Sequence, residues 1–309
     1  MVSIAQSAHP RADGLRLRFQ ALRAPFLGAS ILPYVAGALL APPPMRWGIF
    51  LLGLAAVAGT HLGANLINDY ADTGSGVDTQ DADRYGLFGG SKLIHTGDLP
   101  AAFFLHGAMT AFGIAALAVL ALCVSTGRWD IVGFGLLILL LAWAYSCPPL
   151  KLSYRFLGEP VILLLFGPAV VMGGHSLQSG AFPAAESALL ALPFGLLTTL
   201  VLFANEVPDH AQDMAGGKRT WVHGVGPGSA YRLYAAIASA ALVALVCCIV
   251  AGVLSPWACV GLLSVVPIVK AARILARPPR SRPQCLQSSK LTLAVQSFVS
   301  LVIILDLVL

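Results

Sequence analysis

The chain has 309 residues, of which 57% are apolar and only 11% are charged. Soluble globular proteins carry about 25% charged residues, so this composition excludes a soluble globular protein and predicts a polytopic membrane protein. The formal net charge of +5 reflects the membrane topology described below, and we predict no nucleic-acid partner.

The predicted elements begin with a polar, basic segment over residues 1–24, which has no short apolar stretch ending in a cleavage site. We therefore expect a cytoplasmic segment over 1–24 and a transmembrane domain over 25–309, without a signal peptide. Crossing the hydrocarbon core takes roughly 20 apolar residues. Nine such segments predict an all-α protein with about nine transmembrane helices. They lie approximately at 25–42, 47–67, 100–123, 129–146, 159–177, 184–204, 230–253, 255–272 and 291–308.

The distribution of Lys and Arg predicts the orientation of these helices. If the N-terminus is cytoplasmic, 17 of the 19 basic residues fall in cytoplasmic segments and only Arg46 and Arg128 fall outside. Lys and Arg favour cytoplasmic loops. We therefore predict an integral membrane protein, in a bacterium an inner-membrane protein, with the chemistry-bearing loops on the cytoplasmic side.

The order of the segments also predicts an internal repeat. Two spans precede an acidic loop and two spans follow it, and this order then recurs before a ninth span. Both acidic clusters follow a span that runs from outside to inside, which indicates a parallel duplication. We expect two four-helix halves plus one extra helix.

Each acidic cluster has the spacing of one helix face. In the first, Asn65, Asn68 or Asp69, and Asp72 lie three or four residues apart. Gly76 lets the chain turn, which would bring Asp78 back toward them. Carboxylates at a membrane boundary are costly and usually functional, and hard oxygen ligands suit Mg²⁺. The alternative is that they are solvated helix caps. The candidate metal ligands are Asn65, Asn68, Asp69, Asp72, Asp78, Asn205, Asp209 and Asp213.

Basic residues with glycine or tyrosine neighbours accompany the acidic clusters. Two glycines precede Lys218, and tandem proline ends the fourth span shortly before Lys151. These cations suit phosphate binding, and Tyr145 or Tyr154 could orient an acceptor. The alternative is a positively charged cytoplasmic flank, and the Walker A pattern is absent. The candidate phosphate-binding residues are Lys92, Lys151, Arg155, Lys218 and Arg219.

Three motifs, over residues 65–78, 145–159 and 205–220, together resemble the UbiA superfamily of intramembrane aromatic prenyltransferases. The first motif is most similar to the 1,4-dihydroxy-2-naphthoate prenyltransferase branch. The resemblance extends over roughly residues 20–309. A departure is Pro208, where many members carry Arg.

The resemblance implies Mg²⁺-dependent transfer of an isoprenyl group from an isoprenyl diphosphate to an aromatic or quinoid acceptor in the bilayer. It implies a role in the synthesis of menaquinone or a related prenylated metabolite. The alternative functions are a membrane terpene cyclase and a cation-coupled transporter. The oligomeric state stays open, because the abundant Gly and Ala residues suit helix packing within one chain or between chains. The implied catalytic residues are Asp72, Asp209, Lys151, Arg155 and Tyr145.

Overall fold

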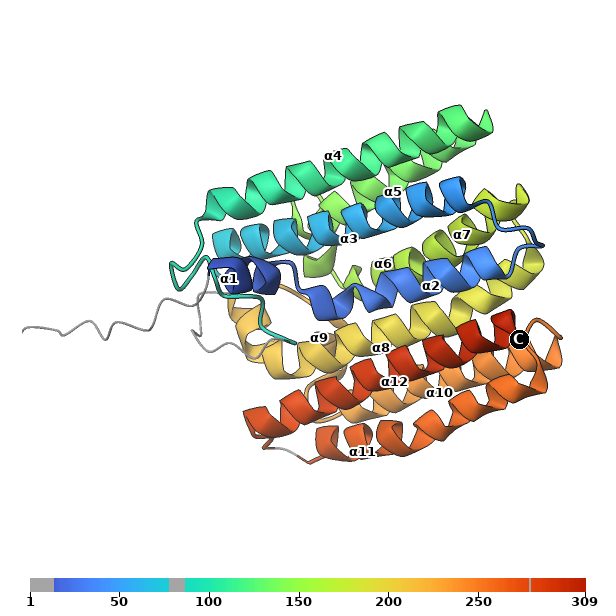
Figure 1. Cartoon of the computed structure of the whole chain (residues 1–309). Helices are drawn as coiled ribbons and strands as arrows, with labels where there is room; N and C mark the ends of the chain where they lie inside the picture. The colour runs from blue at the N-terminus through green and yellow to red at the C-terminus, as the bar shows by residue number, and fades with distance from the viewer. Residues whose placement is uncertain (1–13, 78–86, 278) are drawn as a thin grey trace, which may run out of the picture.

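The apolar segments form a bundle of long helices (Figure 1). The computed structural model describes residues 14–77, 87–277 and 279–309, and within these ranges the chain contains helices and no strand. The elements are α1 (Gly14–Ala21), η1 (Ala24–Phe26), α2 (Gly28–Leu39), α3 (Trp47–Ser75), α4 (Ala101–Thr126), α5 (Asp130–Ser146), η3 (Leu152–Tyr154), α6 (Gly158–Leu164), η4 (Leu165–Ala169), α7 (Val170–Ser179), α8 (Ala185–Ala215), α9 (Trp221–Val225), α10 (Ala230–Val250), η5 (Pro256–Ser264), α11 (Val265–Leu275) and α12 (Arg282–Val308).

The all-α membrane fold predicted from the sequence is confirmed. Among the described residues, seven helices are long and apolar enough to cross a membrane, or eight if the pair formed by residues 14–26 and α2, bent by 48°, is one span. The remaining apolar helix, α5, has 17 residues. Each of the nine predicted segments therefore coincides with an apolar helix, but the count of nine spans stays a prediction.

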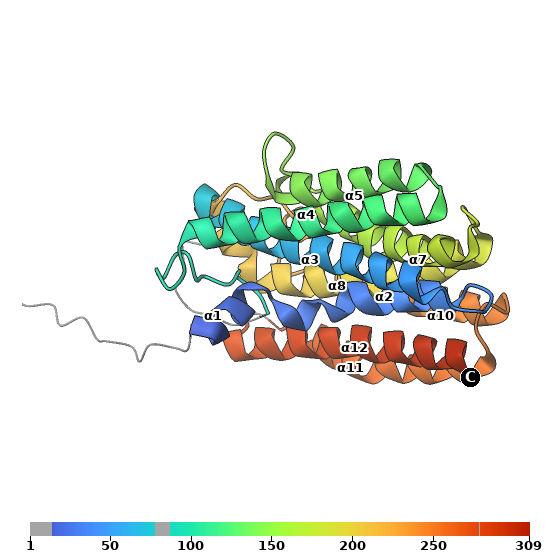
Figure 2. The same ribbon diagram turned by 45° about the horizontal axis from the view of Figure 1, so that its top comes forward.

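Two long helices carry the acidic clusters to one end of the bundle. With 29 and 31 residues, α3 and α8 exceed the roughly 20 needed to cross the hydrocarbon core. Their C-terminal turns lie at the same end, beside α1 and the loop before α4 (Figures 1 and 2). There, Leu17 and Ala21 of α1 pack with Leu66 of α3 and Phe104 of α4. Part of the N-terminal segment thus covers the bundle end that holds the acidic clusters.

The helix ends follow the glycine signals in the sequence. Gly76 ends α3 with φ 85°, a left-handed conformation that glycine adopts without steric cost. After α8, Gly217 has φ 75°, and Lys218 N donates to Asp213 O at 2.8 Å while Gly217 N donates to Met214 O at 3.0 Å. This pair of bonds is a Schellman motif. It folds Lys218 back over the last turn of α8.

Helices α2 and α7 approach so closely that glycine is required between them. A Cβ on Gly37 would lie 2.1 Å from Val171 O. We expect Gly37→Ala to lower the free energy of unfolding by about 1–3 kcal/mol, because an overpacked interface must shift its backbone. The matched control is Gly113→Ala in α4, which has no other group within 4 Å of the new Cβ. Unfolding in detergent measures both variants, and equal destabilisation would contradict this packing.

Candidate active site

The bundle contains a partly open cavity of about 300 Å³ that both acidic clusters line. Its polar end receives side chains from the last turns of α3 and α8, and Leu87–Gly90 covers it. Its other end is apolar, with Leu139 of α5 and Phe166 of the π-helical turn η4 among its lining residues. The cavity therefore suits a ligand with an ionic head and a hydrocarbon tail. The candidate residues that line it are Asn65, Asn68, Asp72, Tyr145, Asn205, Asp209, Asp213 and Lys218.

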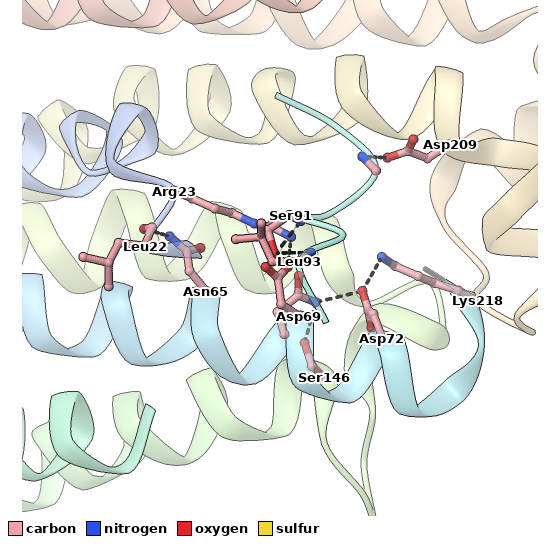
Figure 3. A network of polar contacts seen from close by, with 12 residues as sticks. Leu22, Arg23, Asn65, Asp69, Asp72, Ser91, Leu93, Ser146, Asp209 and Lys218 are labelled. Carbon is pink, nitrogen blue, oxygen red and sulfur yellow. Dashed lines mark hydrogen bonds and ion pairs between the residues drawn. The ribbon is translucent and has the colours of Figure 1, made fainter. Parts of the chain in front are cut away.

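Asp72 is the centre of the polar network on α3 (Figure 3). Its Oδ1 accepts a hydrogen bond of 2.7 Å from the Tyr154 hydroxyl, and its Oδ2 accepts one of 3.0 Å from Asn68 Nδ2. Asn68 Nδ2 also lies 2.9 Å from Ser146 Oγ at the end of α5. Since these partners come from three elements, the position of the Asp72 carboxylate is well defined.

Asp69 does not line the cavity that Asp72 lines. Its carboxylate is buried and pairs with the Arg23 guanidinium, and its Oδ2 accepts a bond of 3.3 Å from Ser91 N. Asp69 and Asp72 are three residues apart, about 60° around the helix, so the contacts of Asp69 with Arg23 and Ser91, and not its helical position, distinguish it from Asp72. Asn65, which does line the cavity, donates to Leu22 O at 3.4 Å (Figure 3).

The α8 cluster faces the same polar end from the opposite side of the loop (Figure 3). Asp209 Oδ2 accepts a hydrogen bond of 2.7 Å from Gly89 N. In the described part of the chain, the buried Asn205 Oδ1 and Asp213 Oδ2 have no hydrogen-bond partner. A buried oxygen without a partner is costly. Two such atoms lie in the wall of one cavity, where they are available to a ligand.

Lys218 connects the two clusters. Its Nζ lies 3.5 Å from Asp72 Oδ2 and 3.7 Å from Asp213 Oδ1. Burial disfavours the charged form of Lys218, but the carboxylates of Asp213 and Asp72 outweigh this effect and hold its pKa well above the usual range. The helix ends also touch, because a Cβ on Gly216 would lie 2.1 Å from Val77 Cγ2. Charged residues of the two clusters, which lie 137 or more positions apart in the sequence, thus come together at one site.

The loop after α5 places its basic residues differently. Lys151 Nζ lies 4.8 Å from the centre of the Tyr154 ring, whose hydroxyl binds Asp72. Lys151 is thereby close to the α3 cluster without lining the cavity. Arg155 is exposed and donates to Pro149 O at 3.3 Å. The buried Lys92 lies beside Asp209, since a Cβ on Gly89 would lie 3.5 Å from both Lys92 Cε and Asp209 Oδ1.

The structure thus brings together eight of the predicted site residues and separates others from the cavity. Asp69 is held by Arg23, and Arg155 and Arg219 extend toward the exterior. These three side chains do not line the cavity in this structure, and their assignment to the binding site stays a prediction. Asp78 lies outside the described residues, and Lys92 and Lys151 form a second layer around the carboxylates.

Three charged residues in or next to the cavity were not among the site residues predicted from the sequence. Arg23 and Glu206 line the cavity, and the fully buried Glu159 accepts a hydrogen bond from Trp221 N. Glu206 Oε2 and Glu159 Oε2 have no hydrogen-bond partner among the described residues. Both glutamates lie inside the sequence motifs, so the motifs could have identified them as candidate site residues. Arg23 precedes the first span outside any motif, and only packing reveals it.

The donor atoms fit a divalent cation that is shared with a ligand. No three His, Cys, Asp or Glu side chains gather as a complete metal site within the ranges that the structure describes. The free oxygens of Asn205 and Asp213, with Asp72 and Asp209 on the same cavity, are instead hard donors that leave positions open. This matches Mg²⁺, which binds one or two carboxylates together with substrate phosphates and retained water.

The fold and the cavity define an intramembrane helical protein whose binding cavity is acidic at one end and apolar at the other. The sequence matches the UbiA prenyltransferase family over residues 30–294. The chain therefore belongs to the UbiA prenyltransferase family, and it is a prenyltransferase. The resemblance inferred from the three motifs is confirmed.

Three known proteins illustrate this membership. The 1,4-dihydroxy-2-naphthoate octaprenyltransferase of Bacillus subtilis is 27% identical over 270 residues, which cover 87% of this chain and 85% of that protein. The apo structure of a UbiA homologue from Aeropyrum pernix K1 has a TM-score of 0.71 at 19% identity, covering 92% of this chain and 98% of that one. A UbiA homologue from Archaeoglobus fulgidus, solved with GPP and Mg²⁺, has a TM-score of 0.60 at 15% identity and covers 93% and 99%.

The position of Lys218 between two carboxylates predicts a stability effect. We expect Lys218→Met to lower the free energy of unfolding by about 3 kcal/mol, because it leaves Asp72 and Asp213 buried without their cation. The control is Arg219→Met, which removes an equal charge from an exposed neighbour and should change stability by less than about 0.5 kcal/mol. Unfolding of the two variants in detergent distinguishes them. A Lys218→Met protein as stable as the control would show that the carboxylates do not depend on Lys218.

Proposed function

We propose that this protein transfers an isoprenyl group from an isoprenyl diphosphate to an aromatic or quinoid acceptor within the membrane, and that the reaction requires Mg²⁺. The observation that carries the proposal is the single cavity that joins both acidic clusters to an apolar interior. A diphosphate bound through metal ions accounts for the acidic end, and a prenyl chain accounts for the apolar end. Burying methylene groups at about 0.8 kcal/mol each anchors such a chain.

In this proposal the two helices hold separate parts of the diphosphate site. Asn68 and Asp72 would hold one Mg²⁺ from α3, and Asn205, Asp209 and Asp213 would hold another from α8. Bound there, Mg²⁺ would supply positive charge that makes diphosphate a better leaving group. Lys218, Lys92 and Lys151 surround the carboxylates and would neutralise further phosphate oxygens. Tyr154 fixes Asp72, while the cavity-lining Tyr145 is placed to orient the acceptor.

The proposed reaction breaks the bond between C1 of the prenyl chain and the diphosphate oxygen, which keeps the electron pair. An electron-rich ring carbon of the acceptor then forms a bond to C1, and a proton leaves that carbon. In the naphthoate case, a carboxylate group leaves instead as carbon dioxide. The nearby lysines would neutralise the leaving diphosphate, and Asp72 and Asp209 would hold the Mg²⁺ that supplies further positive charge. The apolar wall around Phe166 would exclude water from the cation.

Relatives support a naphthoate acceptor and hence a role in menaquinone synthesis. The Bacillus subtilis relative is named a 1,4-dihydroxy-2-naphthoate octaprenyltransferase, and the Archaeoglobus fulgidus structure contains GPP and Mg²⁺. Basic residues concentrate at the bundle end that holds the acidic clusters, whereas Arg46 and Arg128 precede helices at the other end (Figure 1). By the preference of Lys and Arg for the cytoplasm, we propose an active site at the cytoplasmic face of a bacterial inner membrane.

The test is a product assay with the purified full-length protein in detergent. Radiolabelled isoprenyl diphosphates of several lengths are supplied with 1,4-dihydroxy-2-naphthoate, with a phenolic acceptor, or alone. We expect a prenylated quinoid product and equimolar diphosphate only when the naphthoate acceptor is present. A hydrocarbon product formed from the donor alone would instead identify a cyclase. A product formed only with the phenolic acceptor would contradict the menaquinone role.

A further inference from the structure

A second groove lies on the outer surface of the bundle, between α11 and the start of α12. It combines exposed apolar and cationic side chains, which are separate from the cavity of the active site. Its lining includes Val266, Val269, Lys270, Arg273, Arg277 and Gln287. All six of these side chains are exposed. A surface that combines cations with exposed valines suits a ligand that has both an anionic part and an apolar part.

The three cations lie on one face of the helix. Residues 270, 273 and 277 are spaced three and four apart, so Lys270, Arg273 and Arg277 project within about 60° of one another. Val266 precedes Lys270 by four residues and continues the same face. Over the ranges that the structure describes, the groove has no acidic lining residue, and none of the three cations forms an ion pair.

The groove faces the lipid rather than the interior. Helices α11 and α12 pack together at one edge of the bundle, as both views show (Figures 1 and 2). Along α11, the valines come first and the cations follow toward the same bundle end as the acidic clusters (Figure 1). An acyl chain would therefore lie along the valines while its headgroup, closer to the membrane surface, meets Lys270 and Arg273. Long Lys and Arg side chains reach the interface in this way.

We propose that this groove is a binding site for an anionic phospholipid. Its phosphate would lie among Lys270, Arg273 and Arg277, with an acyl chain along Val266 and Val269. Basic pockets between transmembrane helices on the cytoplasmic side recognise anionic headgroups. Charge complementarity selects the anionic lipid over a zwitterionic one, because the cations have no partner of their own within the described chain. The site is independent of the prenyl-transfer reaction.

The test measures lipid bound to the purified full-length protein by native mass spectrometry, with phosphatidylglycerol and phosphatidylcholine in competition. The variant Lys270→Gln/Arg273→Gln/Arg277→Gln is compared with Arg16→Gln/Arg18→Gln/Arg232→Gln, which removes three exposed charges from the same bundle end. We expect the wild type and the control to retain phosphatidylglycerol preferentially, and the groove variant to lose that preference.

Three results would overturn the proposal. One is a groove variant that retains phosphatidylglycerol as the wild type does, and another is a control that loses as much lipid as the groove variant. The third is a mass of two chains that falls to one chain in the groove variant, which would assign the groove to a second copy of the protein. Prenyl transfer by the groove variant, measured in detergent, should remain at the wild-type level, so this test and that of the proposed function fail separately.

Discussion

Asp72→Asn and Asp209→Asn are each expected to lower the rate of prenyl transfer by at least about 100-fold. Either substitution removes a negative charge from the shared cavity while keeping the side-chain shape. The amide cannot hold a divalent cation as a carboxylate does, so the diphosphate would lose charge compensation when it leaves. Transfer of labelled prenyl groups by purified variants, at equal protein concentration, measures the effect.

The control for both variants is Asp130→Asn, since Asp130 is an exposed carboxylate paired with Arg128 at the opposite end of the bundle. It should transfer prenyl groups at the wild-type rate. Membrane insertion and detergent unfolding of each variant separate loss of chemistry from loss of fold, because Asp72 also accepts hydrogen bonds from Tyr154 and Asn68. Near-normal turnover by either variant would refute its role in diphosphate binding.

Removal of divalent cations is expected to abolish prenyl transfer, with a loss of about 100-fold or more, and added Mg²⁺ is expected to restore it. Without the metal, a diphosphate would face Asp72, Asp209 and Asp213, and like charges in a poorly solvated site repel strongly. Lys218 alone cannot compensate them, because its ammonium already lies between Asp72 and Asp213.

The measurement is turnover in EDTA followed by titration with Mg²⁺. Ca²⁺ is an informative comparison, because it prefers six to eight oxygen ligands at longer distances than Mg²⁺ accepts. We expect little recovery with Ca²⁺. Full activity in metal-free buffer would reject the proposed mechanism and leave the buried oxygens of Asn205 and Asp213 unexplained.

Much of the site could be predicted because its residues recur at the spacing of one helix face. Asn205, Asp209 and Asp213 recur every four residues, which places them on one face of α8, and all three line the cavity. Gly76 ends α3, at the place where the sequence predicted that the chain turns. Spacing alone could not choose between Asn68 and Asp69 as the neighbour of Asp72. In the structure Asn68 bonds to Asp72 and lines the cavity with it, whereas Asp69 pairs with Arg23 and does not line the cavity.

The remaining features depend on contacts between distant parts of the chain. Lys218 and Arg219 are adjacent and equally charged, and only the Schellman turn after α8 directs Lys218 inward. Glu159 becomes a buried residue because α6 packs against α8 and its carboxylate meets Trp221 N. The span count depends on the 48° bend between residues 14–26 and α2, and on α5, whose 17 residues fall short of the roughly 20 that cross the hydrocarbon core.

The most direct test of the shared site is a structure of the full-length protein with Mg²⁺ and a non-hydrolysable isoprenyl thiodiphosphate. A shared site predicts a diphosphate located between Asp72 of α3 and Asp209 of α8, with metal density next to each carboxylate and the prenyl chain running toward Phe166. A diphosphate that contacts one acidic cluster alone, or that binds outside this cavity, would contradict it.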